Sequence, residues 1–176
     1  MQKRSQLEFV VLMAALMSIV ALSIDAVLPA LPMIGDYLSV SDPSDNPKLI
    51  TSIFLGLGVG QLIFGPLSDS FGRKPIVYAG FILFVIASII CISTKNFEMM
   101  LFGRVLQGIG LASPRTMCIA MVRDSYEGDH MAKILSIVVM VFILVPIVAP
   151  TLGQFLMNHY DWKFIFTFTL VFGALV

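Results

Sequence analysis

Two opposite charges, Asp25 and Arg104, lie inside long apolar segments of the 176-residue sequence. Asp25 is about nine residues before Ile34, or ~13 Å from that end of its segment at the rise of an α-helix. Arg104 is about seven residues into the fourth apolar segment, ~10 Å from the same surface by the same rise. A charge at such a depth in a bilayer costs at least ~2.5 kcal/mol unless it is paired or hydrated. Two interpretations stay open: a fixed structural ion pair, or a titratable carboxylate whose protonation responds to Arg104 and to a bound molecule.

Two prolines follow Asp25 on nearly the same helical face. Pro29 and Pro32 are four and seven residues further along, which places them within about 40° of Asp25. Proline removes a backbone donor and frees a carbonyl one turn earlier, and a membrane helix tolerates this where neighbours or water satisfy that carbonyl. The pattern predicts a bent helix beside an acid; a plain proline-terminated helix is the alternative.

The fourth apolar segment has further polar residues downstream of Arg104. Gln107 is an amide that needs a partner when buried, while Gly108 and Gly110 permit another helix backbone to approach closely. Arg115 lies eleven residues beyond Arg104, on the same face and nearer the other surface. Its guanidinium is expected either to extend to the lipid headgroups or to line the same polar path.

A charged turn, Gly65-Pro-Leu-Ser-Asp-Ser-Phe-Gly-Arg-Lys74, separates two of the apolar segments. Asp69 is expected to accept backbone donors at a helix end or to pair with a basic residue. Gly72 is expected to need either a positive φ or close helix packing. Arg73 and Lys74 indicate that this turn is cytoplasmic, because basic residues are retained on that side of a membrane.

These side chains must be positioned by membrane helices, because the composition is that of a membrane protein. The chain is 58% hydrophobic and 12% charged, with a mean hydropathy of +0.95, whereas soluble domains carry roughly 25% charged residues. The net charge of zero gives no general attraction to nucleic acid. Cys91 and Cys118 both lie in apolar segments and form neither a disulfide framework nor a metal-binding cluster.

Six apolar segments are long enough, or nearly so, to be spanning helices of about 20 residues. Their expected bounds are about 9–32, 49–68, 76–93, 98–121, 133–157 and 163–176. The last is expected to be a truncated helix, and residues 35–48 a solvated acidic loop. Six basic residues flank the segments on one side and three on the other, which predicts that both termini are cytoplasmic. The six are Lys3, Arg4, Arg73, Lys74, Arg123 and Lys133, and the three are Lys48, Lys95 and Lys163.

Three motifs, in the same order along the chain, resemble those of the major facilitator superfamily. The turn matches the G-x-L-x-D-x-x-G-R-K pattern between the second and third helices of that family. The fourth segment resembles its R-x-x-Q-G-x-G pattern. The fifth resembles the antiporter motif G-x-x-x-G-P-x-x-G-G through Pro150 and Gly153, but Val145, Ala149 and Gln154 depart from it. A helix that is kinked at proline for packing alone is the alternative for this segment.

The resemblance implies an all-α, six-helix transmembrane bundle that forms the amino-terminal half of a twelve-helix transporter, with a hidden three-plus-three repeat. Its drug:proton antiporter branch, of the Bcr/CflA type, implies export of small drug-like molecules across a cell membrane, the bacterial inner membrane in such a family. Asp25, Arg104 and Gln107 would couple transport to protons. Gly65, Asp69, Gly72, Arg73 and Lys74 would form the cytoplasmic gate.

The implied partners are a small-molecule cargo, protons, membrane lipid and a missing carboxy-terminal half, with no cofactor, metal or nucleic acid. The cargo would often be lipophilic or cationic. The chain is not expected to be an enzyme, because no nucleophile–base or metal constellation is present. A uniporter or symporter for a small metabolite, and a non-transporting truncated membrane partner, stay open as alternatives.

Overall fold

The computed structural model describes residues 3–176, with side chains from residue 6 onward, so the side chains of Lys3 and Arg4 lie outside the described part. Every regular element of the described chain is a helix, which confirms the expected all-α class. The α-helices are α1 (Lys3–Asp25), α2 (Leu31–Tyr37), α3 (Lys48–Phe71), α4 (Arg73–Ser93), α5 (Phe97–Ser125), α6 (Gly128–His159) and α7 (Lys163–Leu175). Two short 3₁₀ helices, η1 (Leu28–Ala30) and η2 (Pro43–Asp45), lie in the connections.

By length and hydropathy, five helical stretches within the described residues can cross a membrane. They are Gln6–Tyr37, Pro43–Phe71, Arg73–Ser93, Phe97–Ser125 and Gly128–His159, and α7 is a shorter apolar helix of 13 residues. Each of the six expected segments therefore corresponds to a helical stretch. Most helices extend a few residues beyond the predicted bounds, because their polar first and last turns are helical although they are not apolar.

The first expected helix is interrupted at Asp25. Helix α1 ends at Asp25, η1 begins at Leu28 with Pro29 in its first turn, and α2 begins at Leu31 with Pro32 in its first turn. Proline suits the first turn of a helix but cannot continue an existing one, so each proline starts a new segment. The expectation of a bend beside the acid is confirmed. The expected acidic loop from residue 35 is too long, because α2 continues to Tyr37.

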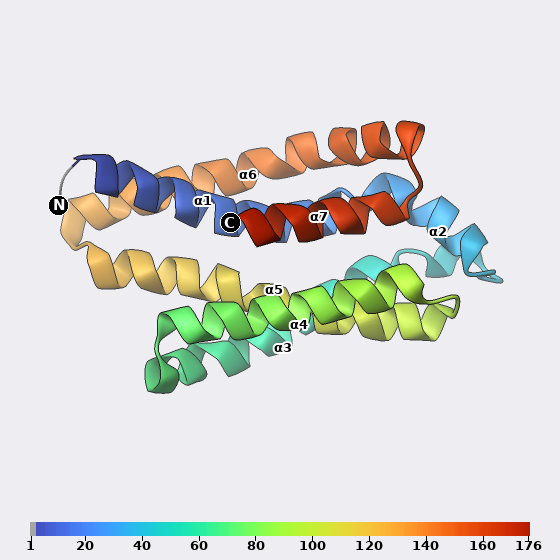
Figure 1. Ribbon diagram of the computed structural model, residues 1–176, viewed down its shortest axis with the longest axis horizontal. Helices are drawn as coiled ribbons and strands as arrows, with labels where there is room; N and C mark the ends of the chain where they lie inside the picture. Colours follow the sequence, from blue (N-terminus) through green and yellow to red (C-terminus); the bar gives the residue numbers. More distant parts are fainter. Residues whose placement is uncertain (1–2) are drawn as a thin grey trace.

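The long helices form two groups, as Figure 1 shows: α1, α6 and α7 lie together, and α3, α4 and α5 lie together. The first helix of the chain thus packs on the last two, while α5 packs on α3 and α4, and α1 also contacts α5. This reciprocal pairing is the one that two inverted three-helix repeats would produce. The amino-terminal end of α1, the α3–α4 turn and the α5–α6 turn lie at one end of the bundle (Figure 1).

Glycine permits very close contact between α3 and α5. A Cβ added to Gly56 would collide with the backbone carbonyl of Val105, and one added to Gly108 would collide with that of Ile53. The two helices therefore approach backbone to backbone, as the small residues in both sequences predict. This contact fixes α5, which carries Arg104 and Arg115, against the helix that leads into the charged turn.

Candidate functional site

Arg104 is completely buried and donates hydrogen bonds to α1, to α3 and within its own helix, α5. Its Nε donates to the carbonyl oxygen of Leu49 in α3, at 3.3 Å, and its Nη1 donates to the carbonyl of Ser23 in α1, also at 3.3 Å. The same Nη1 donates to Gln107 Oε1 at 2.7 Å. A buried charge is tolerated where hydrogen bonds replace its hydration. Arg104 therefore ties α1 and α3 to α5 through neutral acceptors.

Gln107 continues this polar chain into α4. Its Nε2 donates to Ser88 Oγ at 2.8 Å, and Ser88 Oγ donates to the carbonyl of Phe84 at 2.8 Å. The expected need of Gln107 for a partner is thus met on both its oxygen and its nitrogen. On the other side, the guanidinium carbon of Arg104 lies 5.6 Å from the ring centroid of Phe166 in α7, in cation–π geometry.

Asp25 does not pair with Arg104. Within the described residues Asp25 forms no ion pair, and its carboxylate is partly buried at the last turn of α1. The interpretation of a fixed ion pair is therefore wrong for this conformation. Arg104 instead holds the α1 backbone at Ser23, two residues before Asp25. Two buried polar atoms near this point, Arg104 Nη2 and Ser23 Oγ, have no hydrogen-bond partner in the structure.

The fifth apolar segment meets α1 at the interruption. A Cβ added to Gly153 would collide with the carbonyl oxygen of Ala26, the residue after Asp25. Gly153 is therefore required for α6 to reach the backbone where α1 ends. Pro150 lies one turn earlier and is partly buried, and α6 continues as one helix through Pro146 and Pro150. The sequence singled out both residues of the motif, but it carried no signal that Ala26 is the contact.

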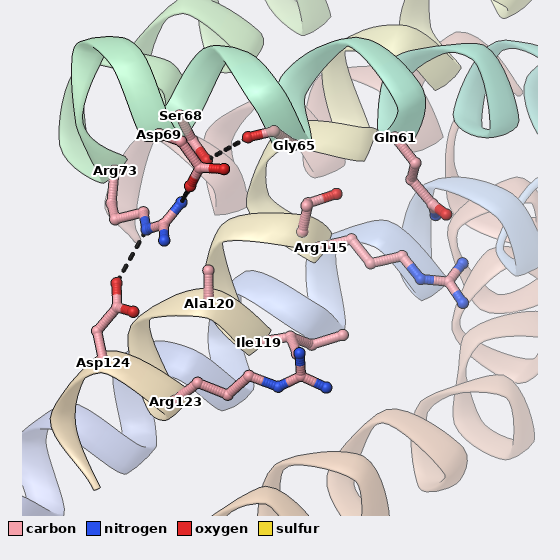
Figure 2. A pocket seen from close by; sticks show the side chains of 11 residues that line it. Gln61, Gly65, Ser68, Asp69, Arg73, Arg115, Ile119, Ala120, Arg123 and Asp124 are labelled. Carbon is pink, nitrogen blue, oxygen red and sulfur yellow. Dashed lines mark hydrogen bonds and ion pairs between the residues drawn. The ribbon is translucent and has the colours of Figure 1, made fainter.

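The charged turn forms an ionic cluster at the opposite end of α5 (Figure 2). Arg73 Nη1 donates to Asp69 Oδ1 at 2.7 Å and to Ser68 Oγ, and Arg73 Nε donates to Asp124 Oδ2 at 2.9 Å. The predicted pairing of Asp69 with a basic residue is confirmed. The cluster connects the end of α3, the start of α4 and the end of α5. Asp124, 51 residues from Arg73, was missed by sequence reasoning; its position at the polar end of the fourth segment was the available signal.

Gly72 sets the geometry of this turn. Its φ of 88° is the left-handed region that favours glycine, while an added Cβ would find only Pro75 Cδ, at 4.0 Å. Of the two expected reasons for glycine here, backbone conformation applies and close packing does not. The Gly65 carbonyl accepts a hydrogen bond from Ser68 Oγ at 2.7 Å, which orients that hydroxyl toward Arg73. Lys74 lies apart from the cluster and lines a different cavity, beside Tyr78.

A cavity of about 530 Å³ opens beside the cluster, between α3 and α5. Arg115 lines it, and the Arg115 guanidinium carbon lies 5.6 Å from the Phe142 ring centroid in α6. Arg104 does not border this cavity, so the expectation that Arg115 lines the same polar path as Arg104 stays a prediction. Figure 2 shows Arg115 and Arg123 extending from α5 on the side away from the Asp124 carboxylate. The full lining is Gln61, Gly65, Ser68, Asp69, Arg73, Arg115, Thr116, Ile119, Ala120, Arg123 and Asp124.

The sequence of this chain was compared with protein families and with individual known proteins. Residues 13–176 match the family model described as Major Facilitator Superfamily. The chain is 31% identical over 174 residues to the "Bicyclomycin resistance protein homolog" of Haemophilus influenzae, covering 99% of this chain and 44% of that protein. It is 31% identical over 169 residues to "Multidrug resistance protein MdtL" of Citrobacter koseri, covering 96% of this chain and 43% of that protein.

A solved structure shares the fold. The human organic anion transporter MFSD10 (TETRAN) superposes with a TM-score of 0.70 at 18% identity, over 99% of this chain and 46% of that one. The chain thus spans less than half the length of the relatives it matches. The likeness to the human protein supports the fold alone, while the two bacterial proteins show relatedness along almost the whole of this chain.

Proposed function

Because the chain belongs to the Major Facilitator Superfamily, a family of transporters and not of enzymes, we propose that it supplies the amino-terminal half of a proton-coupled exporter of small drug-like molecules. The other half would come from a carboxy-terminal six-helix unit. The proposed location is a cell membrane, the inner membrane in a bacterium, with the end that carries Gly72 facing the cytoplasm. The related proteins named for bicyclomycin and multidrug resistance support this choice of cargo class.

The observation that carries the proposal is the position of Asp25. Its carboxylate is partly buried where α1 is interrupted, and it has no cationic partner within the described residues. A carboxylate at a helix C-terminus faces the negative end of the helix dipole. Such a group is suited to take up and release a proton as the environment around the interruption changes.

Arg104 is suited to link that protonation to helix movement. It holds the carbonyl of Ser23, one turn or less before Asp25, and is itself held by Gln107. Movement of α1 at its interruption would therefore change the hydrogen bonds that Arg104 donates. Its Nη2 has no acceptor in the present conformation. In this proposal Arg104 and Gln107 are positioning residues, and Asp25 exchanges the proton. A direct contact between Arg104 and Asp25 would belong to another state of the transport cycle.

The Arg73 cluster is proposed as the cytoplasmic gate. Its hydrogen bonds to Asp69 and Asp124 connect three helices at the end where α3 passes into α4. Separation of these groups would let the helix ends move apart and open the inner side. The two carboxylates of the cluster are solvent-exposed and Arg73 is partly exposed, so breaking the two ion pairs costs little. A low cost is appropriate for a contact that forms and breaks in each cycle.

The proposal is tested by replacing Asp25 in the transporter that carries both halves, reconstituted in liposomes. Asp25→Asn is expected to abolish proton-driven accumulation of bicyclomycin, the uncharged compound in the name of one relative, against its gradient. Asp25→Glu is expected to retain part of it, because the carboxylic acid remains. Asp36→Asn is the matched control, since Asp36 is an exposed acid in the neighbouring α2. A normal pH-dependent gradient with Asp25→Asn would exclude Asp25 as the coupling acid. Transport by the unmodified protein that does not depend on pH would favour a uniporter.

A further inference from the structure

The charges that line the cavity between α3 and α5 are unbalanced. Three arginines and two aspartates line it, leaving one net positive charge. Both carboxylates are already engaged by Arg73, at 2.7 Å for Asp69 and 2.9 Å for Asp124. Within the described residues, Arg115 and Arg123 form no ion pair. Two guanidinium groups therefore border the cavity without an anion from this half of the protein.

The two free guanidinium groups lie on one stretch of α5. Arg115 and Arg123 are eight residues apart, about 12 Å along the helix axis, and Ile119 lies between them on the same face. Arg115 is partly buried and its guanidinium also lies over the Phe142 ring, which fixes it without neutralising it. Together they form a surface with a cation at each end and an aliphatic side chain in the middle. An organic molecule with an anionic group and an apolar body has the complementary chemistry.

We infer that this cavity is an inner binding site for small organic anions, held by Arg115 and Arg123 through a carboxylate, sulfonate or phosphate group. The inference rests on the proposed function, because it names a class of cargo for the same transporter. Guanidinium groups bind such oxyanions in bidentate fashion. A cationic cargo would meet net repulsion at the same site, so the cavity selects against the cationic molecules that the sequence resemblance suggested.

A small molecule suits the cavity better than a lipid does. Its volume of about 530 Å³ is within the range of pockets that hold small ligands, which is roughly 300–1,000 Å³. Thr116 and Ala120 complete its α5 wall with small side chains, so the space beside the arginines is not filled by the protein itself. An anionic lipid headgroup offers the same oxyanion chemistry, and the experiment below separates the two sources.

The test is equilibrium binding to the transporter with both halves, in phosphatidylcholine nanodiscs and without a proton gradient. The probes are tritiated naphthalene-2-carboxylate, its neutral carboxamide and 2-naphthylmethylammonium, which share one ring system. The carboxylate is expected to bind most tightly. The double variant Arg115→Gln/Arg123→Gln is expected to weaken its binding by about tenfold or more, because two charge-assisted contacts are lost, while carboxamide binding stays unchanged. Unchanged carboxamide binding also shows that the double variant is folded.

Matched variants make the result specific. Lys133→Gln removes a positive charge from the same end of the bundle but outside this cavity, and is expected to change nothing. Arg115→Lys/Arg123→Lys keeps both charges and is expected to retain most of the binding. Equal binding of the three probes, or no effect of the double variant, would overturn the inference. The inference would also be overturned if phosphatidylglycerol bound at the two arginines and the naphthalene carboxylate did not compete with it. The site would then serve a lipid.

The two proposals fail separately in these measurements. Asp36→Asn is expected to bind the naphthalene carboxylate normally, because Asp36 is an exposed acid outside the cavity lining. If Asp25→Asn still pumps but the arginine variants lose anion binding, the coupling proposal fails and the anion site stands. If Asp25→Asn stops pumping and the arginine variants bind all three probes equally with no loss relative to the unmodified protein, the coupling proposal stands and the anion-site proposal fails.

Discussion

Arg104 and Arg73 lie toward opposite ends of the bundle and are satisfied by opposite kinds of acceptor. Arg104 is fully buried and bonds to two backbone carbonyls and an amide oxygen, with no carboxylate among its partners. The Arg73 side chain is 28% exposed and bonds to two carboxylates. The difference shows that the buried charge is held as a structural centre, whereas the exposed one is held by contacts that water can replace.

The cost of disruption follows from this difference. Removing one partner from a buried network leaves the others unsatisfied, each at a desolvation cost of about 1–3 kcal/mol. Exposed ion pairs contribute only about 0–1 kcal/mol, because water hydrates the separated charges. The Arg104 end should therefore control stability, and the Arg73 end should control the balance between conformations.

The largest expected effect tests that contrast with one substitution at both sites. Arg104→Met is expected to lower the free energy of unfolding by about 3 kcal/mol or more, because the Ser23 and Leu49 carbonyls and Gln107 Oε1 lose their donor. Arg73→Met is expected to lower it by less than about 1 kcal/mol. Thermal unfolding of the two variants in the same detergent measures both. Equal losses would show that burial does not distinguish the two arginines.

The second-largest effect is expected where Gly153 of α6 packs against the interruption of α1. Gly153→Ala is expected to destabilise the protein by about 1–3 kcal/mol, since the new Cβ meets the Ala26 carbonyl and backbone must shift. Gly58→Ala is the matched control, because nothing lies within 4 Å of its added Cβ. In mid-helix the alanine is expected to be neutral or stabilising by about 0.5–1 kcal/mol. A smaller loss with Gly153→Ala than with Gly58→Ala would show that α6 does not depend on this contact.

The parts of this arrangement that the sequence predicted are those that local pattern controls. Apolar segments predicted the helices, two prolines predicted the bend after Asp25, and Asp69 and Arg73 are only four residues apart, on the two sides of the α3–α4 turn. Gly72 was expected to need either a positive φ or close helix packing, and its φ is 88°. Each of these depends on residues that are close together in the chain.

The parts that could not be predicted depend on tertiary contacts. The partners of Arg104 include the backbone carbonyls of Ser23 and Leu49, and every residue has such a carbonyl, so no residue type marks them. Ser88 is one small polar residue in an apolar segment, and only the approach of α4 to α5 makes it a partner of Gln107. The absence of an Asp25–Arg104 pair has the same origin, since equal depth in the membrane does not fix which face of α1 meets α5.

The smallest change in stability is expected from Asp124→Asn, which tests the other side of the comparison. This substitution weakens the link between α5 and the start of α4, and should change the free energy of unfolding by less than about 1 kcal/mol. It should nevertheless shift the transporter toward its inward-open state.

That shift can be measured with a cysteine introduced by Thr116→Cys, at a position that lines the cavity. Its labelling rate with a membrane-impermeant maleimide reports the opening of the inner side. The native cysteines of this half, Cys91 and Cys118, are both buried and do not interfere. Asp129→Asn, an exposed acid in the first turn of α6, is the control and should leave the rate unchanged. Faster labelling with Asp124→Asn alone would establish that the exposed cluster sets conformation without setting stability. The same rate in all three proteins would show that Arg73 and Asp124 do not form a gate.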